Sequence, residues 1–199
     1  MEMGTRELMA RRAAQELSRG NLVNLGIGIP TLVAEFIDPA LNIVLHSENG
    51  FTGLGPAPKK GSEEPDLTNA GGFPVTMLPG GAYFDSLVSF AIVRGGKLDV
   101  TILGGLEVNQ RGDLANWIVP GKIVPGMGGG MDLALKARKT IVIMTHCTKD
   151  GEPKILKECS LPLTARECVN MIITDLAVIE VTPDGLVLRE VAQSISPEE

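Results

Sequence analysis

The chain has 199 residues, a length that suits one well-packed domain, and we predict that residues 1–199 form a single domain. Apolar residues make up 44% of the sequence and charged residues 21%, which indicates a large buried sheet or apolar surface facing another chain. The net charge of −6 lacks the basic footprint of nucleic-acid-binding proteins, so no nucleic acid is expected as a partner. No apolar run approaches bilayer-spanning length, so no membrane partner is expected either.

The cysteine and histidine content disfavours metal-binding and disulfide-rich classes. The three cysteines, Cys147, Cys159 and Cys168, are odd in number and include no Cys-x-x-Cys pair. His46 and His146 are the only histidines, too few for a multi-histidine metal site. The charged amino-terminal segment has no apolar core of the kind that a signal peptide needs. These features predict no metal site and a reduced, cytoplasmic setting.

Apolar runs and turn residues in the first part of the chain predict a βαβ unit. In chain order we expect a helix from Thr5 to Arg19 capped by Gly20, a strand at Leu22–Leu25, a glycine turn at Gly26–Thr31, a helix from Leu32 to Ile37 and a strand at Asn42–Leu45. A strand, a helix and a second strand in this order form a parallel pair. The predicted fold class is therefore α/β, with an open, mostly parallel sheet and flanking helices.

The rest of the chain continues this alternation after a polar stretch, Pro56 to Asp66, whose Pro and Gly content is typical of a loop. We expect a strand at Val75–Leu78, a helix from Tyr83 to Val93, a strand at Leu98–Leu103, a hairpin of Leu106–Val108 with Leu114–Trp117, a helix from Met131 to Arg138, a central strand at Thr140–Met144, a helix starting at the capping box Thr164–Glu167, and paired strands at Ile173–Val181 and Leu186–Val191. The last residues, Ser196–Glu199, carry a further helix-start signal.

Glu48 follows the strand predicted at Asn42–Leu45, within the run Leu45-His46-Ser47-Glu48-Asn49-Gly50. In open α/β sheets, ligands bind beyond the carboxyl ends of the strands. Glu48 is therefore a candidate functional carboxylate. A solvated charge on a loop explains the same pattern equally well.

The turn Gly26-x-Gly28, after a strand and before a helix, is compatible with two kinds of site. It is similar to a dinucleotide-binding turn, and Glu48 lies at about the distance along the chain that would place it on a ribose hydroxyl. Against this interpretation, the third glycine is missing and Pro30 stiffens the turn. The narrower expectation is that backbone N–H groups at this helix start hold an anion or a carbonyl oxygen.

The second glycine cluster, Gly126 to Gly130, has the same physical meaning, because backbone N–H groups without side chains can approach a reacting oxygen. A helix entry that needs glycine only for tight packing is the alternative. A carboxylate beside such donors suggests nucleophilic catalysis on an activated acyl group. His46 is interpreted as structural. Cys147 beside His146 is a weaker nucleophile candidate, because adjacency in sequence provides no orientation.

Several motifs in order resemble the two-subunit (family I) coenzyme A transferases, and their B chain in particular. The run at residues 45–50 resembles the active-site signature of that family. The other matching segments are Asn24–Thr31, Leu98–Thr101, Gly112–Trp117, Pro120–Lys122 and Gly126–Gly129. Together they extend over nearly the whole chain.

The resemblance implies an open α/β fold of the ribose-phosphate isomerase-like type, with Glu48 as the nucleophile. In the family mechanism the glutamate attacks an acyl-CoA thioester and then carries CoA as a glutamyl-CoA thioester until an acceptor acid reverses the steps. Coenzyme A is thus a substrate, and no permanently bound cofactor is implied. By position the resemblance assigns substrate or CoA contacts to Asn24, Gly28, Asn49, Gly50, Asn116, Gly128, Gly129 and Gly130.

The resemblance also implies a homologous A subunit in an A2B2 hetero-oligomer, with an acyl-CoA and a carboxylic acid as substrates. A 3-oxoacid CoA-transferase that uses succinyl-CoA and acetoacetate is the first expectation. Acetate or butyrate with acetoacetate, 3-oxoadipate with succinyl-CoA, and a non-catalytic CoA- or nucleotide-binding module are the alternatives. The chain departs from the family at Phe51-Thr52, where two aliphatic or aromatic residues are usual, and at Glu199, where family members usually continue with a helix.

Overall fold

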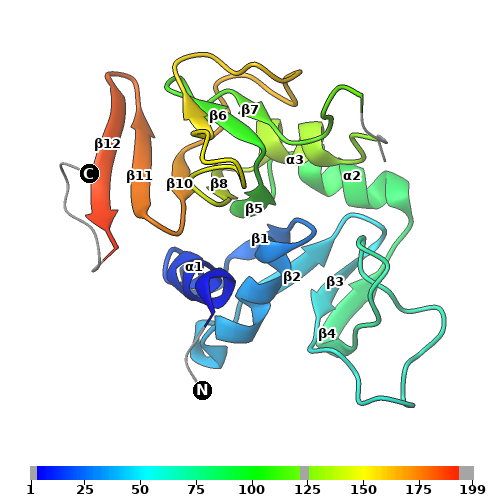
Figure 1. Cartoon of the computed structure of the whole chain (residues 1–199). Coiled ribbons are helices and arrows are strands. Elements are labelled where there is room, and N and C mark those ends of the chain that lie inside the picture. Colours follow the sequence, from blue (N-terminus) through cyan, green and yellow to red (C-terminus); the bar gives the residue numbers. More distant parts are fainter. Residues whose placement is uncertain (1–3, 122–125, 193–199) are drawn as a thin grey trace.

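A nine-stranded sheet forms the centre of the computed structural model, which describes residues 4–121 and 126–192 (Figure 1). Its strand order is β12-β11-β10-β8-β5-β1-β2-β3-β4. The bounds of these strands are Leu22–Leu25 (β1), Val44–Ser47 (β2), Phe51–Leu54 (β3), Met77–Tyr83 (β4), Val100–Gly104 (β5), Lys139–Ile143 (β8), Met171–Ile173 (β10), Ala177–Thr182 (β11) and Gly185–Val191 (β12). The strands from β10 to β2 run parallel and the outer pairs are antiparallel, which confirms the predicted open, mostly parallel sheet.

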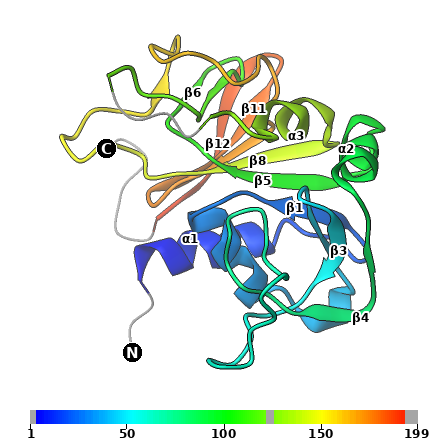
Figure 2. The same cartoon turned by 90° about the vertical axis from the view of Figure 1, so that its right-hand side faces the viewer.

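Helices cover both faces of this sheet. They are α1 (Thr5–Ala14), the 3-10 helices η1 (Ile29–Phe36) and η2 (Pro39–Leu41), α2 (Ser86–Arg94) and α3 (Gly130–Lys136). Figure 2 shows α1 on one side of the strands and α2 with α3 on the other. A separate three-stranded sheet contains β6 (Glu107–Asn109), β7 (Leu114–Ala115) and β9 (Ile155–Leu156). The antiparallel pairing of β6 and β7 confirms the predicted hairpin.

Side-chain alternation along the strands divides the core into two layers. Ile141 and Ile143 of β8 pack in the layer that contains α1, whereas Val142 between them packs in the layer that contains α3. Ile102 and Leu103 of β5 divide in the same way. Because successive residues of a strand point to opposite faces, a strand covered on both faces must be apolar at every position. The predicted central strand at Thr140–Met144 meets this condition and lies inside the sheet.

Three predicted elements in the first part of the chain have different bounds in the structure. The first helix ends at Ala14, because the next amides, of Glu16 and Leu17, bond only three residues back. The crossover helix is a 3-10 helix that begins at Ile29. The second strand starts two residues late, at Val44, because Asn42 has a φ of 49° and cannot continue a strand.

The strand predicted at Val75–Leu78 and the helix predicted from Tyr83 also begin later than expected. The strand β4 starts at Met77 and continues through Tyr83. The helix α2 starts at Ser86, where the Asp85 side chain caps it by accepting a hydrogen bond from the amide of Val88 at 2.8 Å. The loop at Pro56–Asp66 contains no helix or strand, as predicted.

The helix predicted from the capping box at Thr164 is wrong. The Thr164 hydroxyl donates to the side chain of Asn116 at 2.6 Å instead of capping a helix. The carbonyl of Ala165 accepts from the Leu114 amide in an isolated bridge, and Glu167 has a φ of 48°. The capping-box pattern is local, and here long-range partners occupy the groups that a helix would use.

The strand predicted at Ile173–Val181 is two strands, β10 and β11, separated by a turn. The Thr174 hydroxyl accepts hydrogen bonds from the amides of Leu176 and Ala177, which closes the turn. The helix-start signal at Ser196–Glu199 and Lys122 of the family motif lie outside the described residues.

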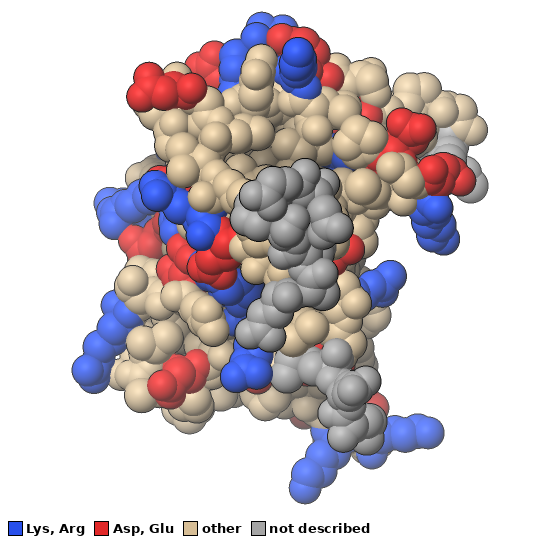
Figure 3. Space-filling model, turned by 60° about the vertical axis from the view of Figure 1, so that its left-hand side comes forward, with Lys and Arg blue, Asp and Glu red and all other residues tan. Residues whose placement is uncertain are grey.

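Basic and acidic side chains are interspersed on the face shown in Figure 3. One ion-paired group joins α1 to the sheet: Arg12 bonds Glu190 of β12 and Glu16, and Glu16 bonds Lys139 of β8. This group holds the amino-terminal helix against strands from the far end of the chain. In the described part of the chain, no helix is long and apolar enough to cross a membrane.

We expect Ile102→Ala to lower the free energy of unfolding by about 2–5 kcal/mol, because Ile102 is fully buried between β5 and the α1 layer. Leu188→Ala is the control, since Leu188 is 47% exposed on β12 and should change stability by less than about 1 kcal/mol. Urea unfolding followed by the fluorescence of Trp117, the only tryptophan, measures both. Equal losses in the two variants would contradict the two-layer core.

Candidate active site

A row of polar residues crosses three neighbouring strands inside the apolar sheet. Asn24 of β1 is paired with Thr101 of β5 on one side and with His46 of β2 on the other. All three side chains are buried, with at most 2% of their surface exposed. Because paired residues of adjacent strands point to the same face, the row lies on the face covered by α2. Buried polar groups in such a place need hydrogen-bond partners.

Asn24 connects this row to Glu48. Its Nδ2 donates to the Glu48 carboxylate oxygen Oε2 at 2.9 Å and to the His46 carbonyl at 3.3 Å. Glu48 is partly exposed, and its Oε1 has no hydrogen-bond partner among the described residues. One carboxylate oxygen is therefore held from the sheet while the other is left accessible.

Two buried oxygens in the same row have no hydrogen-bond partner in the part of the chain that the structure describes. They are Oδ1 of Asn24 and Oγ1 of Thr101, on paired residues of β1 and β5. A buried polar group without a partner typically costs about 1–3 kcal/mol. Such costs concentrate at functional sites, where the surrounding fold tolerates them. Asn24 is thus positioned through its amide nitrogen, on the side that faces Glu48.

His46 forms a second chain of hydrogen bonds that leads into α2. Its Nε2 lies 3.0 Å from Oγ of Ser89, and the Ser89 hydroxyl donates to the Ser47 carbonyl at 3.4 Å. On the other side of the ring, Nδ1 lies 3.5 Å from Nδ2 of Asn24. These partners fit a neutral imidazole that donates from Nε2 and accepts at Nδ1. Burial lowers the pKa of His46 to about 4, which keeps the ring neutral at physiological pH.

The other residues of the Ser-Glu-Asn-Gly run build the surroundings of Glu48. The Ser47 hydroxyl accepts from the amide of Ala70 at 3.1 Å, and the Asn49 side chain donates to the Thr68 carbonyl at 2.7 Å. Both bonds tie the loop between β3 and β4 to the site. Gly50 has a φ of 135°, and a Cβ there would lie 2.3 Å from the carbonyl oxygen of Phe84. This close approach of two backbones requires glycine.

The second glycine cluster lies beside Glu48. A Cβ on Gly129 would be 3.6 Å from Cγ of Glu48 and 3.1 Å from the ring of Phe90 on α2. Neither Gly128 nor Gly129 has a backbone N–H bonded to another described residue. Two groups that are 80 residues apart in the sequence are therefore next to one another, with donors available near the carboxylate.

Asn116 lies beside the same glycine cluster but not against Glu48. A Cβ on Gly130 would be 3.9 Å from Oδ1 of Asn116. The Asn116 side chain donates to the Gly104 carbonyl at 3.0 Å and accepts from the Thr164 hydroxyl at 2.6 Å. Its described bonds therefore join the carboxyl end of β5 to the segment that precedes α3.

Two sequence-derived candidates are not joined to this group. Gly28 is exposed, with a φ of 93°, and its carbonyl accepts from the side chain and amide of Thr31 at the start of η1. The ring of His146 bonds Thr174 at 3.1 Å, and no hydrogen bond to Cys147 sulfur is formed among the described residues. The structure therefore does not assemble a cysteine–histidine pair.

Thr101, Ser89 and Phe90 were not found from the sequence. Thr101 belongs to an apolar run, and Ser89 and Phe90 lie inside a helix, so only the pairing of β5 with β1 and the packing of α2 bring them to the site. A polar residue in an otherwise apolar strand was the available signal at Thr101. No group of three or more residues suited to a metal ion occurs in the described part of the chain.

A carboxylate at the carboxyl edge of a parallel sheet, with glycine N–H groups beside it, defines a site for acyl transfer. The family model for coenzyme A transferase matches residues 6–196. The chain therefore belongs to the coenzyme A transferase family, and it is a transferase.

Among curated relatives, the B chain of the succinyl-CoA:3-ketoacid coenzyme A transferase of Helicobacter pylori is 53% identical over 191 residues, which cover 96% of this chain and 92% of that protein. The beta chain of the acetate CoA-transferase of Escherichia coli is also 53% identical, over 190 residues that cover 96% of this chain and 87% of that protein. Among solved structures, an acyl-CoA transferase apoenzyme from Escherichia coli O157:H7 has a TM-score of 0.79 at 26% identity. The match covers all of this chain and 40% of that longer one.

The pKa of His46 predicts a specific pH dependence of stability. The unfolded ring titrates near 6.5 and the folded ring near 4, so the unfolded state binds more protons between these values. The contribution to stability is complete above pH 6.5 and is lost as the pH falls toward 4, by at most about 1.4 kcal/mol per pH unit.

Urea unfolding from pH 7 to pH 4 should show this loss in the wild-type protein and a smaller slope in His46→Gln. NMR titration of the His46 ring protons measures the folded pKa directly. A folded-state midpoint near 6.5 would show that the ring is not held neutral by burial.

Proposed function

We propose that Glu48 is the nucleophile of a CoA transferase that moves CoA between an acyl-CoA and a carboxylic acid. The observation that carries this proposal is the 2.9 Å hydrogen bond from Asn24 to Oε2 of Glu48, which leaves Oε1 accessible beside Gly129. A carboxylate fixed by one oxygen is oriented for attack by the other.

In the first half-reaction Oε1 of Glu48 attacks the carbonyl carbon of the acyl-CoA thioester. The C–S bond breaks, CoA leaves as a thiolate, and an acyl–glutamyl anhydride remains. The thiolate then attacks the glutamyl carbonyl carbon, and the original acid leaves as its carboxylate. The product is a glutamyl-CoA thioester on Glu48. In the second half-reaction an acceptor carboxylate takes the same steps in reverse, which regenerates Glu48 and releases the new acyl-CoA.

The protein groups around Glu48 have distinct tasks in these steps. Negative charge develops on the attacked carbonyl oxygen, and the N–H groups of Gly128 and Gly129 are the donors near it. Asn24 holds the carboxylate in the ground state and stays beside the glutamyl group after acylation. Binding energy from the long CoA moiety offsets the cost of forming an anhydride from a thioester. CoA is a substrate in this scheme, and no resident cofactor or metal takes part.

For the acid pair we propose a 3-oxoacid, with succinyl-CoA as donor and acetoacetate as acceptor. The Helicobacter pylori relative named for this reaction supports the proposal. The second candidate is an acetate CoA-transferase, because the Escherichia coli relative of that name has the same 53% identity. Turnover with each donor and acceptor pair distinguishes them. A non-catalytic binding module is disfavoured by the hydrogen-bonded Glu48.

We further propose that this chain works with a homologous A subunit, in an A2B2 assembly. The relatives above are named as the B or beta members of such pairs. Large apolar side chains are exposed on the adjacent helices α2 and α3: Leu87 (77%), Val88 (44%), Met131 (45%) and Leu135 (48%). Such a face is suited to burial against another chain.

Incubation of the complex with acyl-CoA, in the absence of an acceptor acid, should produce a CoA-sized thioester adduct that maps to Glu48. Intact-mass and peptide mass spectrometry measure it. Glu48→Ala should form no adduct. Unchanged turnover in Glu48→Gln, once deamidation has been excluded, would sink the nucleophile assignment.

Gly129→Ala should lower kcat by about tenfold to a hundredfold, because the added methyl group would press on both Glu48 and Phe90 and displace the carboxylate. Gly129 has a φ of −80°, so alanine causes no backbone strain. Gly130→Ala is the matched control, since its methyl group would make only ordinary contacts at 3.8 Å or more. Steady-state kinetics of both variants test the prediction, and equal kcat values would refute the crowding at Glu48.

A further inference from the structure

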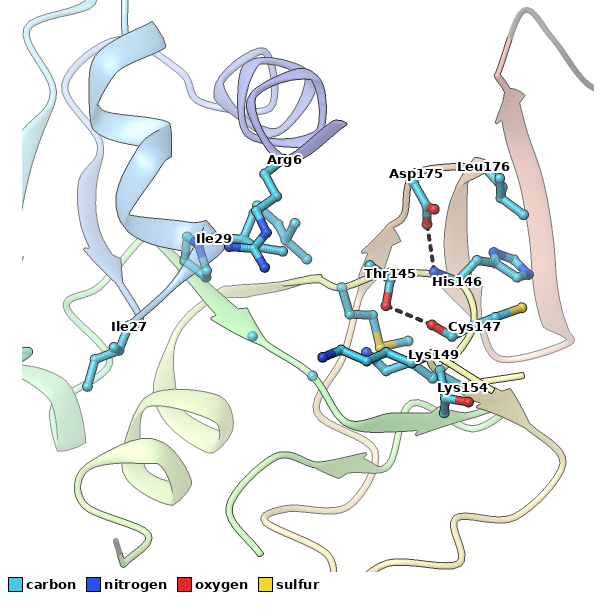
Figure 4. A pocket seen from close by; sticks show the side chains of 16 residues that line it. Arg6, Ile27, Ile29, Thr145, His146, Cys147, Lys149, Lys154, Asp175 and Leu176 are labelled. Atoms are coloured by element: carbon cyan, nitrogen blue, oxygen red, sulfur yellow. Dashed lines mark hydrogen bonds between the residues drawn. The ribbon is translucent and has the colours of Figure 1, made fainter. Parts of the chain in front are cut away.

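A cavity of about 560 Å³ opens at the same edge of the sheet as Glu48, over the ends of β5, β8 and β10 (Figure 4). Its apolar lining includes Ile29, Pro30, Ile143, Met144 and Leu176. Its volume is in the range of small-molecule sites. None of the residues assigned to catalysis lines it.

The charged residues of this cavity are mostly basic. Arg6 reaches it from α1, and Lys149 and Lys154 reach it from the segment after β8 (Figure 4). Asp175 is the only acidic residue in the lining, and its carboxylate already accepts from the His146 amide at 2.7 Å. None of the three cations forms an ion pair with a described residue. In a chain with a net charge of −6, this is a local excess of positive charge.

Lys154 supports this interpretation, because it is half-buried and lies beside apolar groups. Burial lowers its pKa, and the charge of Asp175 only partly opposes that effect. An anion that enters the cavity would favour the charged amine. Apolar walls with unpaired cations suit a ligand with an apolar body and an anionic end.

The cavity is within reach of Glu48 for a single extended ligand. Gly104 lines the cavity and also accepts the hydrogen bond from Asn116. Going from β2, which carries Glu48, to β8 crosses β1 and β5. At about 4.8 Å per strand spacing this is roughly 14 Å. The extended pantetheine arm of CoA spans such a separation between its thiol and its phosphates.

We propose that Arg6, Lys149 and Lys154 bind the phosphate-bearing end of CoA in this cavity while the thioester lies at Glu48. The inference rests on the proposed function. Several cations around one cavity suit the multiple charges of the CoA phosphates better than the single distal carboxylate of an acid substrate. Phosphate groups attract basic side chains by charge-assisted hydrogen bonds.

The test uses the complex with its A subunit and the variants Lys149→Gln, Lys154→Met and their combination. The combined variant should raise the KM for acyl-CoA about tenfold or more with kcat little changed, as for loss of hydrogen bonds to a charged group. With an acyl-pantetheine thioester, which lacks the phosphates, the variant and the wild type should have equal KM values. Lys97→Gln is the matched control, because Lys97 is an exposed lysine that precedes β5, at the opposite edge of the sheet.

A raised KM for the carboxylic acid alone would show that the cavity holds the acid and would overturn the proposal, as would an unchanged KM for acyl-CoA. Calorimetric titration with CoA and with pantetheine separates this proposal from the nucleophile assignment. Weaker CoA binding in the variant, without any Glu48 adduct in the wild type, supports the cavity alone. An adduct with unchanged CoA affinity supports the nucleophile alone. Lys149 is exposed, so Lys149→Gln keeps the test available if the combined variant does not fold.

Discussion

The hydrogen bond between Asn24 and Glu48 depends on the register of two parallel strands. Asn24 is paired with His46, and Glu48 is the first residue beyond β2. A shift of one residue in this pairing would turn Asn24 and His46 to different faces of the sheet. Apolar residues that flank Asn24 on β1 pack in the α1 layer and thereby fix the register. The catalytic geometry that we propose is thus a consequence of how the core is packed.

Polar groups inside this sheet are tolerated because each is tied to a neighbour or to the site. His46 is neutral, and Ser89 on α2 provides its partner. The unpaired oxygens of Asn24 and Thr101 are the exception, and they lie in the same row that positions the carboxylate. A row built only of apolar side chains would pack more favourably but could not orient Glu48. Stability has been given up here at the one place where orientation matters.

The Ser-Glu-Asn-Gly run concentrates four different roles in consecutive residues. Ser47 and Asn49 fasten the loop between β3 and β4, and Gly50 lets the backbone before α2 approach closely. The helix α2 then supplies Ser89 beneath His46 and Phe90 beside Gly129. Glu48 is the only member of the run whose side chain has an accessible, unbonded atom among the described contacts. Its neighbours therefore explain its orientation better than its own sequence position does.

The sequence by itself determined the α/β class, the apolar strands and the family, because strand periodicity and ordered motifs are local properties of the chain. It also indicated Glu48 and the glycine cluster. The tertiary structure alone brought Gly129 against Glu48, added Ser89 and Thr101, and left Gly28 apart. The capping box at Thr164 shows the reason: its local pattern favours a helix, but hydrogen bonds to Asn116 and Leu114 from elsewhere in the chain decide otherwise. Contacts between distant segments, which no local pattern encodes, assemble the site.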